Sequence, residues 1–215
     1  MVKIAPSLLS VDVSQMAYEI NRLCAAGADY LHIDIMDGVF VPNKVGGPEY
    51  VAKIKSLSPI PLDVHLMVEK PKELLPLYIK AGADRLTIHR EIDEDVRGCL
   101  MMIKEAGVKA GVSLKPETAA IKLLNLRDVL DIVLVMTVEP GWGGQPFMKD
   151  MLPKIRDARN LMKDFSAEIE VDGGINDQTG PLCVKAGADV LVSGNYLLNA
   201  PDLNRALRAL KGMNK

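Results

Sequence analysis

Aromatic residues, cysteines and long apolar runs are all scarce in this sequence. Phe, Trp and Tyr make up 4 % of the 215 residues, and the three cysteines (Cys24, Cys99 and Cys183) lie far apart in no metal-type spacing. This argues against a disulfide framework or a cysteine metal site and suits reduced thiols in the cytoplasm. No stretch reaches the roughly 18 apolar residues of a membrane span, and none follows a basic N-terminal segment as in a secretory signal.

An excess of charge of either sign is also absent. Lys and Arg total 26, Asp and Glu total 28, and the formal net charge is −2, so the charge does not indicate nucleic acid or an anionic membrane as a partner. The apolar content of 48 % is enough for the core of one large domain. We therefore expect a cytoplasmic globular protein that binds neither nucleic acid nor membrane.

A tetrapeptide recurs along the chain. Ala-Gly-Ala-Asp occurs at residues 26–29, 81–84 and 186–189, and the related Ala-Gly-Val at 106–108. Each copy follows a stretch with helical spacing and precedes an apolar run rich in β-branched residues or leucine. Glycine suits a helix end because it takes the left-handed conformation without a steric penalty from Cβ. Each copy therefore predicts a helix end followed by a strand.

The spacing of these glycines predicts the architecture. Their successive intervals of 55, 25 and 80 residues are close to two, one and three copies of a unit of about 27 residues, roughly one eighth of the chain. We therefore expect an α/β protein consisting of a single (β/α)₈ TIM barrel domain over residues 1–215. Helices are expected in every gap, the last from about Asp202. The expected strands cover residues 2–8, 29–36, 61–68, 84–90, 108–114, 131–138, 168–172 and 189–194.

Polar and apolar residues alternate in several of these strands. In a barrel the outer face of each strand lies under helices and must be apolar, so the polar face points inward. The only cation that we place inward is Lys3, at the N-terminal end of the first strand. Because several unpaired carboxylates are costly in such an interior, some must be protonated, bridged or bound to a cation. The inward carboxylates and histidines include His32, Asp34, Asp63, His65, Glu170 and Asp172.

Four of these residues lie at the C-terminal ends of their strands, where barrel enzymes have their active sites. Two imidazoles with two carboxylates suit a first-row divalent metal ion, and the expected ligands are His32, Asp34, His65 and Asp172. Asp63 and Glu170, deeper in the barrel, are expected to orient them. His89 fits a supporting or structural histidine better than a ligand. The alternative is that all are ordinary polar residues at strand ends.

Three glycine clusters follow the sixth, seventh and eighth expected strands. Barrels commonly bind a phosphate in the last two of these loops, where backbone N–H groups face the anion. The first cluster begins with Pro140-Gly141 and resembles a lid with glycine hinges. The alternative is that each cluster is only a tight turn. The clusters are Gly141-Trp142-Gly143-Gly144, Asp172-Gly173-Gly174 and Ser193-Gly194-Asn195.

Six runs of the sequence resemble the ribulose-phosphate 3-epimerase family, over essentially the whole chain. This resemblance implies a (β/α)₈ barrel that interconverts D-ribulose 5-phosphate and D-xylulose 5-phosphate in the pentose phosphate pathway. It also implies one divalent metal ion per subunit, for which we expect Zn²⁺ or Fe²⁺ ahead of Mn²⁺ or Co²⁺. Homo-oligomers, dimers or hexamers, are usual in the family. The runs are KIAPSLLSVD, LHIDIMDGVFVPN, LDVHLMVEKP, VMTVEPGWGGQPF, IEVDGGIN and GADVLVSGNYL.

The resemblance also implies roles for individual residues. Asp34 and Asp172 are the expected acid/base pair as well as metal ligands, and Ser7 and His65 are expected to contact the sugar. Inversion at C3 needs one carboxylate on each side of the sugar, one to remove the C3 proton and one to return a proton. The intermediate between the two steps is an enediolate. The expected substrate and phosphate positions are Gly141, Trp142, Gly143, Gly144, Asp172, Gly173, Gly174, Gly194 and Asn195. Methionines at the same rim are expected either to cap the intermediate or to pack the barrel: Met36, Met67 and Met136.

Three positions depart from the family pattern. Asn195 replaces a serine, Trp142 a phenylalanine and Lys115 an asparagine. The metal ligands are unaffected, but the substrate preference is open, and the nearest alternative is D-allulose 6-phosphate 3-epimerase.

Activities of other classes are less well supported. A decarboxylase that resembles orotidine-phosphate decarboxylase needs Asp-x-Lys-x-x-Asp, whereas the corresponding stretch here is DVHLMV. A Schiff-base lyase would have to use Lys115. A sugar-phosphate binder without activity would not need the acid/base pair.

Overall fold

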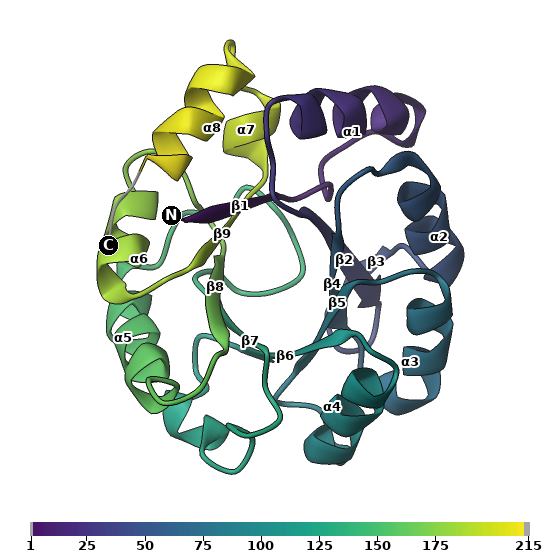
Figure 1. Cartoon of the computed structure of the whole chain (residues 1–215), viewed down its shortest axis with the longest axis vertical. Coiled ribbons are helices and arrows are strands. Elements are labelled where there is room, and N and C mark those ends of the chain that lie inside the picture. The colour runs from purple at the N-terminus through teal and green to yellow at the C-terminus, as the bar shows by residue number, and fades with distance from the viewer. Residues whose placement is uncertain (1, 213–215) are drawn as a thin grey trace.

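Parallel strands form the inner wall of the protein, and helices surround them (Figure 1). The computed structural model describes residues 2–212, so residue 1 and residues 213–215 of the expected domain lie outside the described residues. Eight of the described strands belong to the barrel, and the short β3 (Lys44–Val45) pairs antiparallel with the end of β2. The barrel strands are β1 (Lys3–Pro6), β2 (Leu31–Asp37), β4 (Leu62–Met67), β5 (Arg85–His89), β6 (Lys109–Leu114), β7 (Ile132–Met136), β8 (Glu168–Asp172) and β9 (Val190–Ser193).

The sheet curls until its first and second strands meet. The strand order is β1-β9-β8-β7-β6-β5-β4-β2-β3, so hydrogen-bonded pairing runs from β1 round to β2. Ser7 and His32 then form a parallel bridge, and the Leu8 N–H donates to the His32 carbonyl at 3.0 Å. All neighbouring barrel strands are parallel. The α/β fold with a single TIM barrel, predicted from the glycine spacing, is confirmed.

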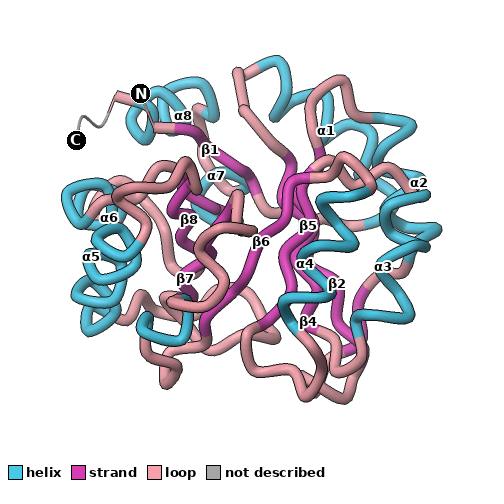
Figure 2. Tube along the Cα trace, turned by 60° about the horizontal axis from the view of Figure 1, so that its bottom comes forward, coloured by secondary structure: helices cyan, strands magenta, loops and turns pink. Residues whose placement is uncertain are grey.

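Helices cover the outer face of the strands, as Figure 2 shows for the cyan segments around the magenta ones. The apolar alternates of β2, namely Leu31, Ile33 and Ile35, are buried beneath this layer. No helix of residues 2–212 is both long and apolar enough to cross a membrane. The α-helices are α1 (Met16–Ala25), α2 (Pro48–Leu57), α3 (Pro71–Lys80), α4 (Val96–Glu105), α5 (Leu152–Leu161), α6 (Gly180–Ala186), α7 (Asn195–Leu198) and α8 (Leu203–Lys211). The 3₁₀-helices are η1 (Val13–Gln15), η2 (Ala120–Leu123) and η3 (Lys149–Met151).

The prediction of an α-helix in every gap is wrong between β6 and β7. That segment holds only η2 followed by turns. Its buried side chains Leu123, Leu126 and Val129 recur every three residues, and the N–H of each of the last two donates to the carbonyl of the residue three before it. A three-residue repeat matches 3₁₀ turns, whereas an α-helix requires 3.6 residues per turn.

The repeat glycines end helices as predicted. Gly27, Gly82, Gly107 and Gly187 follow α1, α3, α4 and α6, and all four have φ between 77° and 115°. The last helix begins after Asp202, whose carboxylate accepts from the Arg205 N–H as an N-cap.

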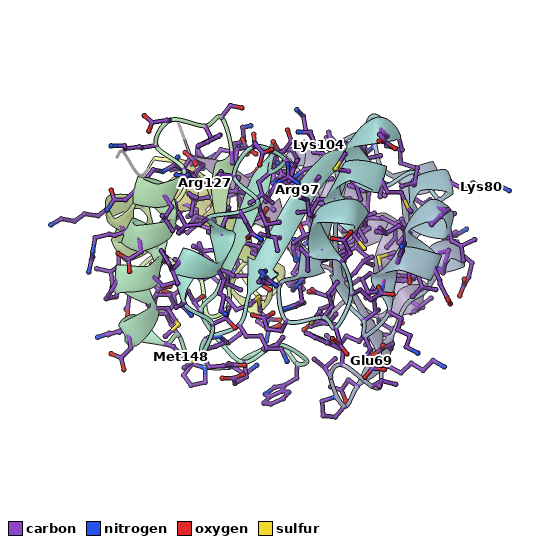
Figure 3. All side chains as sticks on the ribbon, turned by 90° about the horizontal axis from the view of Figure 1, so that it is seen from below. Glu69, Lys80, Arg97, Lys104, Arg127 and Met148 are labelled. Carbon is purple, nitrogen blue, oxygen red and sulfur yellow. The ribbon has the colours of Figure 1, made fainter. Side chains whose placement is uncertain are left out.

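The loops that follow the strands gather at one end of the barrel. Figure 3 shows Glu69 and Met148, which come after β4 and β7, at the lower edge of the view. Lys104, near the end of α4, lies toward the upper edge. The C-terminal ends of the strands therefore open toward the end of the barrel that Glu69 and Met148 mark, which is where a barrel active site is expected.

Candidate active site

The four residues predicted as metal ligands meet at this end of the barrel. His32 and Asp34 lie on β2, His65 lies opposite Asp34 on β4, and Asp172 ends β8. One donor atom from each residue lies within 4.8 Å of the others. Asp172 is half-buried and the other three are almost wholly buried. The structure therefore brings the predicted set together from three strands.

The histidine atoms that face this cluster fit an ion. His32 Nε2 and His65 Nδ1 are buried and have no hydrogen-bond partner among residues 2–212. They lie 3.5 and 3.4 Å from Asp34 Oδ1. Ligand atoms around a tetrahedral Zn²⁺ are roughly 3.4 Å apart. Because a buried polar atom without a partner is costly, two such atoms beside Asp34, with an Asp172 oxygen within 4.8 Å, indicate a cation site.

The pKa values of Asp34 and Asp172 are shifted in opposite directions. Burial acts to raise the pKa of Asp34, but attraction to the neighbouring His32 and His65 outweighs burial and holds this pKa well below its ordinary value. Burial, and then repulsion from Asp34, raise the pKa of Asp172 to about 7. One carboxylate is therefore ionised while the other readily holds a proton, as a coupled acid/base pair requires.

Below the four clustered residues lies a second layer of charged residues. His32 Nδ1 is 2.8 Å from Asp63 Oδ2, and this contact directs Nε2 of the same ring at the cluster. Asp63 also accepts from Arg85 Nε at 3.0 Å, and Glu170 accepts from Arg85 Nη2 at 2.7 Å. Asp63 thus contacts the His32 ring, whereas Glu170 approaches His32 Nδ1 only to 3.6 Å, and their expected role of orienting metal ligands stays a prediction.

The prediction that Lys3 is the only inward cation is wrong. The Lys3 ammonium binds Glu168 and Tyr30 at the opposite end of the barrel, where its side chain is 44 % exposed. Arg85 is the buried cation, and it binds Asp63, Glu168 and Glu170. The signal was present, because Arg85 has the same parity in its strand as the inward Thr87 and His89. The deeper carboxylates thus have a counter-charge, and Asp34 and Asp172 remain for an ion.

A cavity of about 350 Å³ opens above Asp34 and Asp172. His65 is fully buried and does not line it, so its expected contact with the sugar stays a prediction. Thr179 and Tyr196 also line the cavity, and no pattern in the sequence pointed to them. Of the predicted substrate and capping residues, those that line it are Ser7, Met36, Met67, Met136, Gly141, Trp142, Gly143, Gly144, Asp172, Gly173, Gly174, Gly194 and Asn195.

The glycines after β8 serve the packing of the loops. Gly173 and Gly174 have φ of 124° and 66°, and a Cβ on Gly174 would lie 2.7 Å from the Phe147 nitrogen. A Cβ on Gly173 would lie 2.5 Å from a Val138 methyl. The tight turn that we kept as an alternative is thus part of their role, and it leaves their backbone on the cavity wall.

The loop after β7 reaches over the cavity mouth. The Asn43 side chain donates to the Gly141 carbonyl at 2.7 Å, and Gln145 donates to the Glu139 and Trp142 carbonyls. The Trp142 residue is 51 % exposed although it lines the cavity. These contacts tether both sides of the glycine-rich segment while the indole remains in solvent.

Lys115 occupies a position that does not suit a Schiff base. Its ammonium lies 4.0 Å from the centroid of the Phe40 ring, and Lys115 is not among the described residues that line the cavity. The Phe40 ring in turn lies 4.6 Å from the ring of His89. The lysine therefore acts on the wall behind the site, by a cation–π contact.

Known proteins resemble this chain over nearly its whole length. A family model described as Ribulose-phosphate 3 epimerase family matches residues 3–198. The chain is 43 % identical over 215 residues to the ribulose-phosphate 3-epimerase of Bacillus subtilis (strain 168), with 99 % of each chain covered. It is 37 % identical over 212 residues to the chloroplastic ribulose-5-phosphate-3-epimerase of Arabidopsis thaliana, covering 97 % of this chain and 75 % of that one. The resemblance seen in the sequence is confirmed.

Solved structures share the architecture at much lower identity. A 3-hexulose-6-phosphate synthase from Salmonella typhimurium has a TM-score of 0.75 and 20 % sequence identity, with 99 % of this chain and 98 % of that chain covered. At that identity the likeness shows the fold alone.

Proposed function

We propose that this chain, which belongs to the ribulose-phosphate 3-epimerase family, interconverts D-ribulose 5-phosphate and D-xylulose 5-phosphate. Membership of that family makes it an isomerase. The observation that carries the proposal is the placement of Asp34 and Asp172, which line one cavity from strands β2 and β8 and whose pKa values are shifted in opposite directions.

The two carboxylates are suited to inversion at a carbon next to a carbonyl. The ionised one takes the C3 proton from one face of the sugar, which leaves an enediolate, and the protonated one returns a proton to the other face. In the reverse direction the roles exchange. The hydroxyl of Ser7 donates to Asp34 Oδ2 at 2.9 Å and so holds this carboxylate in place.

The side chains at the cluster fit one divalent ion, Zn²⁺ or Fe²⁺ by preference. His32, Asp34, His65 and Asp172 would hold it. When bound, such an ion supplies Lewis-acid stabilisation of the negative charge that develops when the C3 proton leaves. The three methionines on the cavity wall exclude water from the same region.

The phosphate end of the substrate belongs at the glycine loops. The cavity wall there includes Gly173, Gly174 and Gly194, whose backbone is not covered by a side chain. Asn195 adds a side-chain amide close to Gly144, since a Cβ built on Gly144 would lie 3.1 Å from the amide nitrogen. Backbone N–H groups without bulky side chains suit an anion. The sugar then extends from these loops toward Asp34.

The deciding experiment follows solvent deuterium. Purified protein incubated with D-ribulose 5-phosphate in D₂O is expected to form D-xylulose 5-phosphate carrying one deuterium at C3, read by NMR or mass spectrometry. Asp34→Asn and Asp172→Asn are each expected to lower the rate by about 10²–10⁴-fold, the usual contribution of one acid/base group. The exposed Asp177→Asn serves as the matched control.

Two outcomes would contradict the proposal. The acid/base assignment fails if either active-site variant keeps near-normal turnover. The substrate assignment fails if D-allulose 6-phosphate, assayed side by side, is turned over much faster than the pentulose.

The cellular setting that we propose rests on family membership alone. The protein is proposed to be a cytoplasmic homo-oligomer, a dimer or hexamer, that acts in the pentose phosphate pathway. Light scattering after size-exclusion chromatography measures the assembly, and a monomeric mass would contradict it.

A further inference from the structure

Three side chains lead outward from the four-residue cluster of His32, Asp34, His65 and Asp172. They are His65 on β4, His89 at the end of β5 and Glu91 two residues after it. His65 Nε2 lies 2.9 Å from His89 Nε2, and His89 Nδ1 lies 3.0 Å from Glu91 Oε2. Both imidazoles are 0 % exposed. The other nitrogen of His65, Nδ1, is the unpartnered atom that faces Asp34. Glu91 is therefore linked to the cluster through two rings.

Glu91, the outermost of the three side chains, is an acceptor. Glu91 Oε1 accepts from the Lys115 N–H at 2.9 Å, and burial, which acts to raise the pKa of Glu91, is outweighed by hydrogen bonds from His89 and Thr118. The pKa of Glu91 is lowered to about 2. An ionised carboxylate can only accept, so the proton in its contact with His89 belongs to the imidazole.

The proton on His89 Nδ1 determines where the ring protons of His89 and His65 lie. A neutral imidazole carries one N–H, so a proton on His89 Nδ1 leaves His89 Nε2 as an acceptor. The facing His65 Nε2 must then be the donor. Because neutral His65 in turn has only one N–H, its Nδ1 carries a lone pair, directed at the metal cluster.

We propose that Glu91 and His89 are positioning residues that hold His65 in the Nε2–H tautomer, with Nδ1 presented as a lone-pair donor to the ion. The inference rests on the proposed metal dependence and deepens it. Asp63 has the same role for His32 by direct contact. It binds Nδ1 of that ring, and Nε2 is left without a hydrogen-bond partner. The two ligands therefore use opposite ring nitrogens.

Neighbouring side chains keep His89 and Glu91 in place. The Phe40 ring packs against His89 at 4.6 Å with a tilt of 44°, and the Lys115 ammonium lies 4.0 Å from the centroid of the Phe40 ring. These contacts fix the plane of the His89 ring and keep water from it. The Lys115 side chain, which departs from the family pattern, contributes the contact with Phe40, whereas the N–H that Glu91 accepts from belongs to the backbone of this residue.

Tautomers are measured directly by long-range ¹H–¹⁵N NMR on the metal-free protein. The chain has three histidines, so each ring can be assigned with few variants. We expect His65 as the Nε2–H tautomer in the wild type. In Glu91→Ala we expect a mixture of tautomers at His65 and a Zn²⁺ affinity weaker by about 10–100-fold, the usual effect of removing an outer partner of a ligand.

Two further variants separate positioning from loss of structure. Glu91→Gln keeps the size of the side chain but has one acceptor oxygen, which the fixed Lys115 backbone N–H takes. Its NH₂ group then faces His89 Nδ1, so this variant is expected to reverse both rings, with the His65 proton on Nδ1 and a weaker Zn²⁺ affinity. The exposed Asp93→Ala, in the same loop, is expected to change neither.

The inference is overturned if wild-type His65 carries its proton on Nδ1. It is also overturned if folded Glu91→Ala keeps both the wild-type tautomer and the wild-type affinity. The wild-type spectrum needs no variant, so the test stands even where Glu91→Ala does not fold. Wild-type protein that binds no divalent ion would instead contradict the proposed metal dependence. That outcome is distinguishable, because the tautomer of His65 is measured without metal.

Discussion

The Ser7 hydroxyl donates a 2.9 Å hydrogen bond to Asp34 Oδ2, across the seam where β1 closes onto β2. The same hydroxyl accepts from the Leu9 N–H at 3.2 Å, so the loop after β1 sets its direction. The residue that closes the barrel is thus also the one that holds a proposed catalytic carboxylate.

Removing this hydroxyl is expected to reduce turnover more than stability. Ser7→Ala loses one hydrogen bond to a charged group, about 1.5 kcal/mol, or roughly tenfold in kcat/KM. Steady-state kinetics measure it, with Ser10→Ala, whose exposed side chain lines the same cavity, as control. Equal activity of wild type and Ser7→Ala would show that Asp34 is oriented without Ser7.

Removal of the metal is expected to abolish activity. Elemental analysis of freshly purified protein is expected to find one divalent ion per chain, and dialysis against a chelator is expected to remove both ion and turnover. Adding back Zn²⁺ or Fe²⁺ is expected to restore activity and raise the melting temperature, because an ion that binds only the folded state stabilises it. Full activity in metal-free protein would be incompatible with the proposed site.

The buried ion network predicts a large stability effect. Arg85→Leu leaves Asp63 and Glu170 without their cation, and breaking a buried pair in this way costs about 3–5 kcal/mol of unfolding free energy. Arg97→Leu removes a pair with Asp128 at the surface and is expected to cost less than about 1 kcal/mol. Urea denaturation measures both, and similar losses in the two variants would contradict the role given to Arg85.

Acid is expected to remove the contribution of Glu91 to stability. Its pKa is about 2 in the folded protein against an ordinary 4.5, so the ionised group stabilises the fold above pH 4.5 and this stabilisation is lost as the pH falls toward 2. The unfolding free energy of wild type is expected to exceed that of Glu91→Gln by about 2 kcal/mol at pH 6. The difference should shrink by pH 3, and one that stays constant with pH would refute the assignment.

Trp142 offers a signal for substrate binding. It is the only tryptophan of the chain, it is 51 % exposed, and it lies in the loop at the cavity mouth. Saturation with D-ribulose 5-phosphate is expected to shift its emission to the blue and to protect it from acrylamide quenching, because closure of the loop takes the indole out of water. Trp142→Phe removes the signal and is the control. Unchanged quenching at saturation would argue against closure.

The strand periodicity alone predicted which side chains face inward. Successive side chains of a strand point to opposite faces, so once helices cover one face, His32 and Asp34 must share the other. The same argument placed His65 and Asp172, and the recurring glycines predicted the eight-unit barrel. These features are local or repeat along the chain, which is why they are visible in the sequence.

The partners of those side chains were decided by the tertiary structure. Arg85 meets Glu170 across 85 positions of sequence, and Ser7 meets Asp34 across 27, because the register between parallel strands and the closure of the sheet set which side chains share a level. The contact of His65 with His89 depends on how two rings from adjacent strands fit in one confined interior. Local pattern therefore determined which groups enter the barrel, and packing determined which proton or ion each of them can hold.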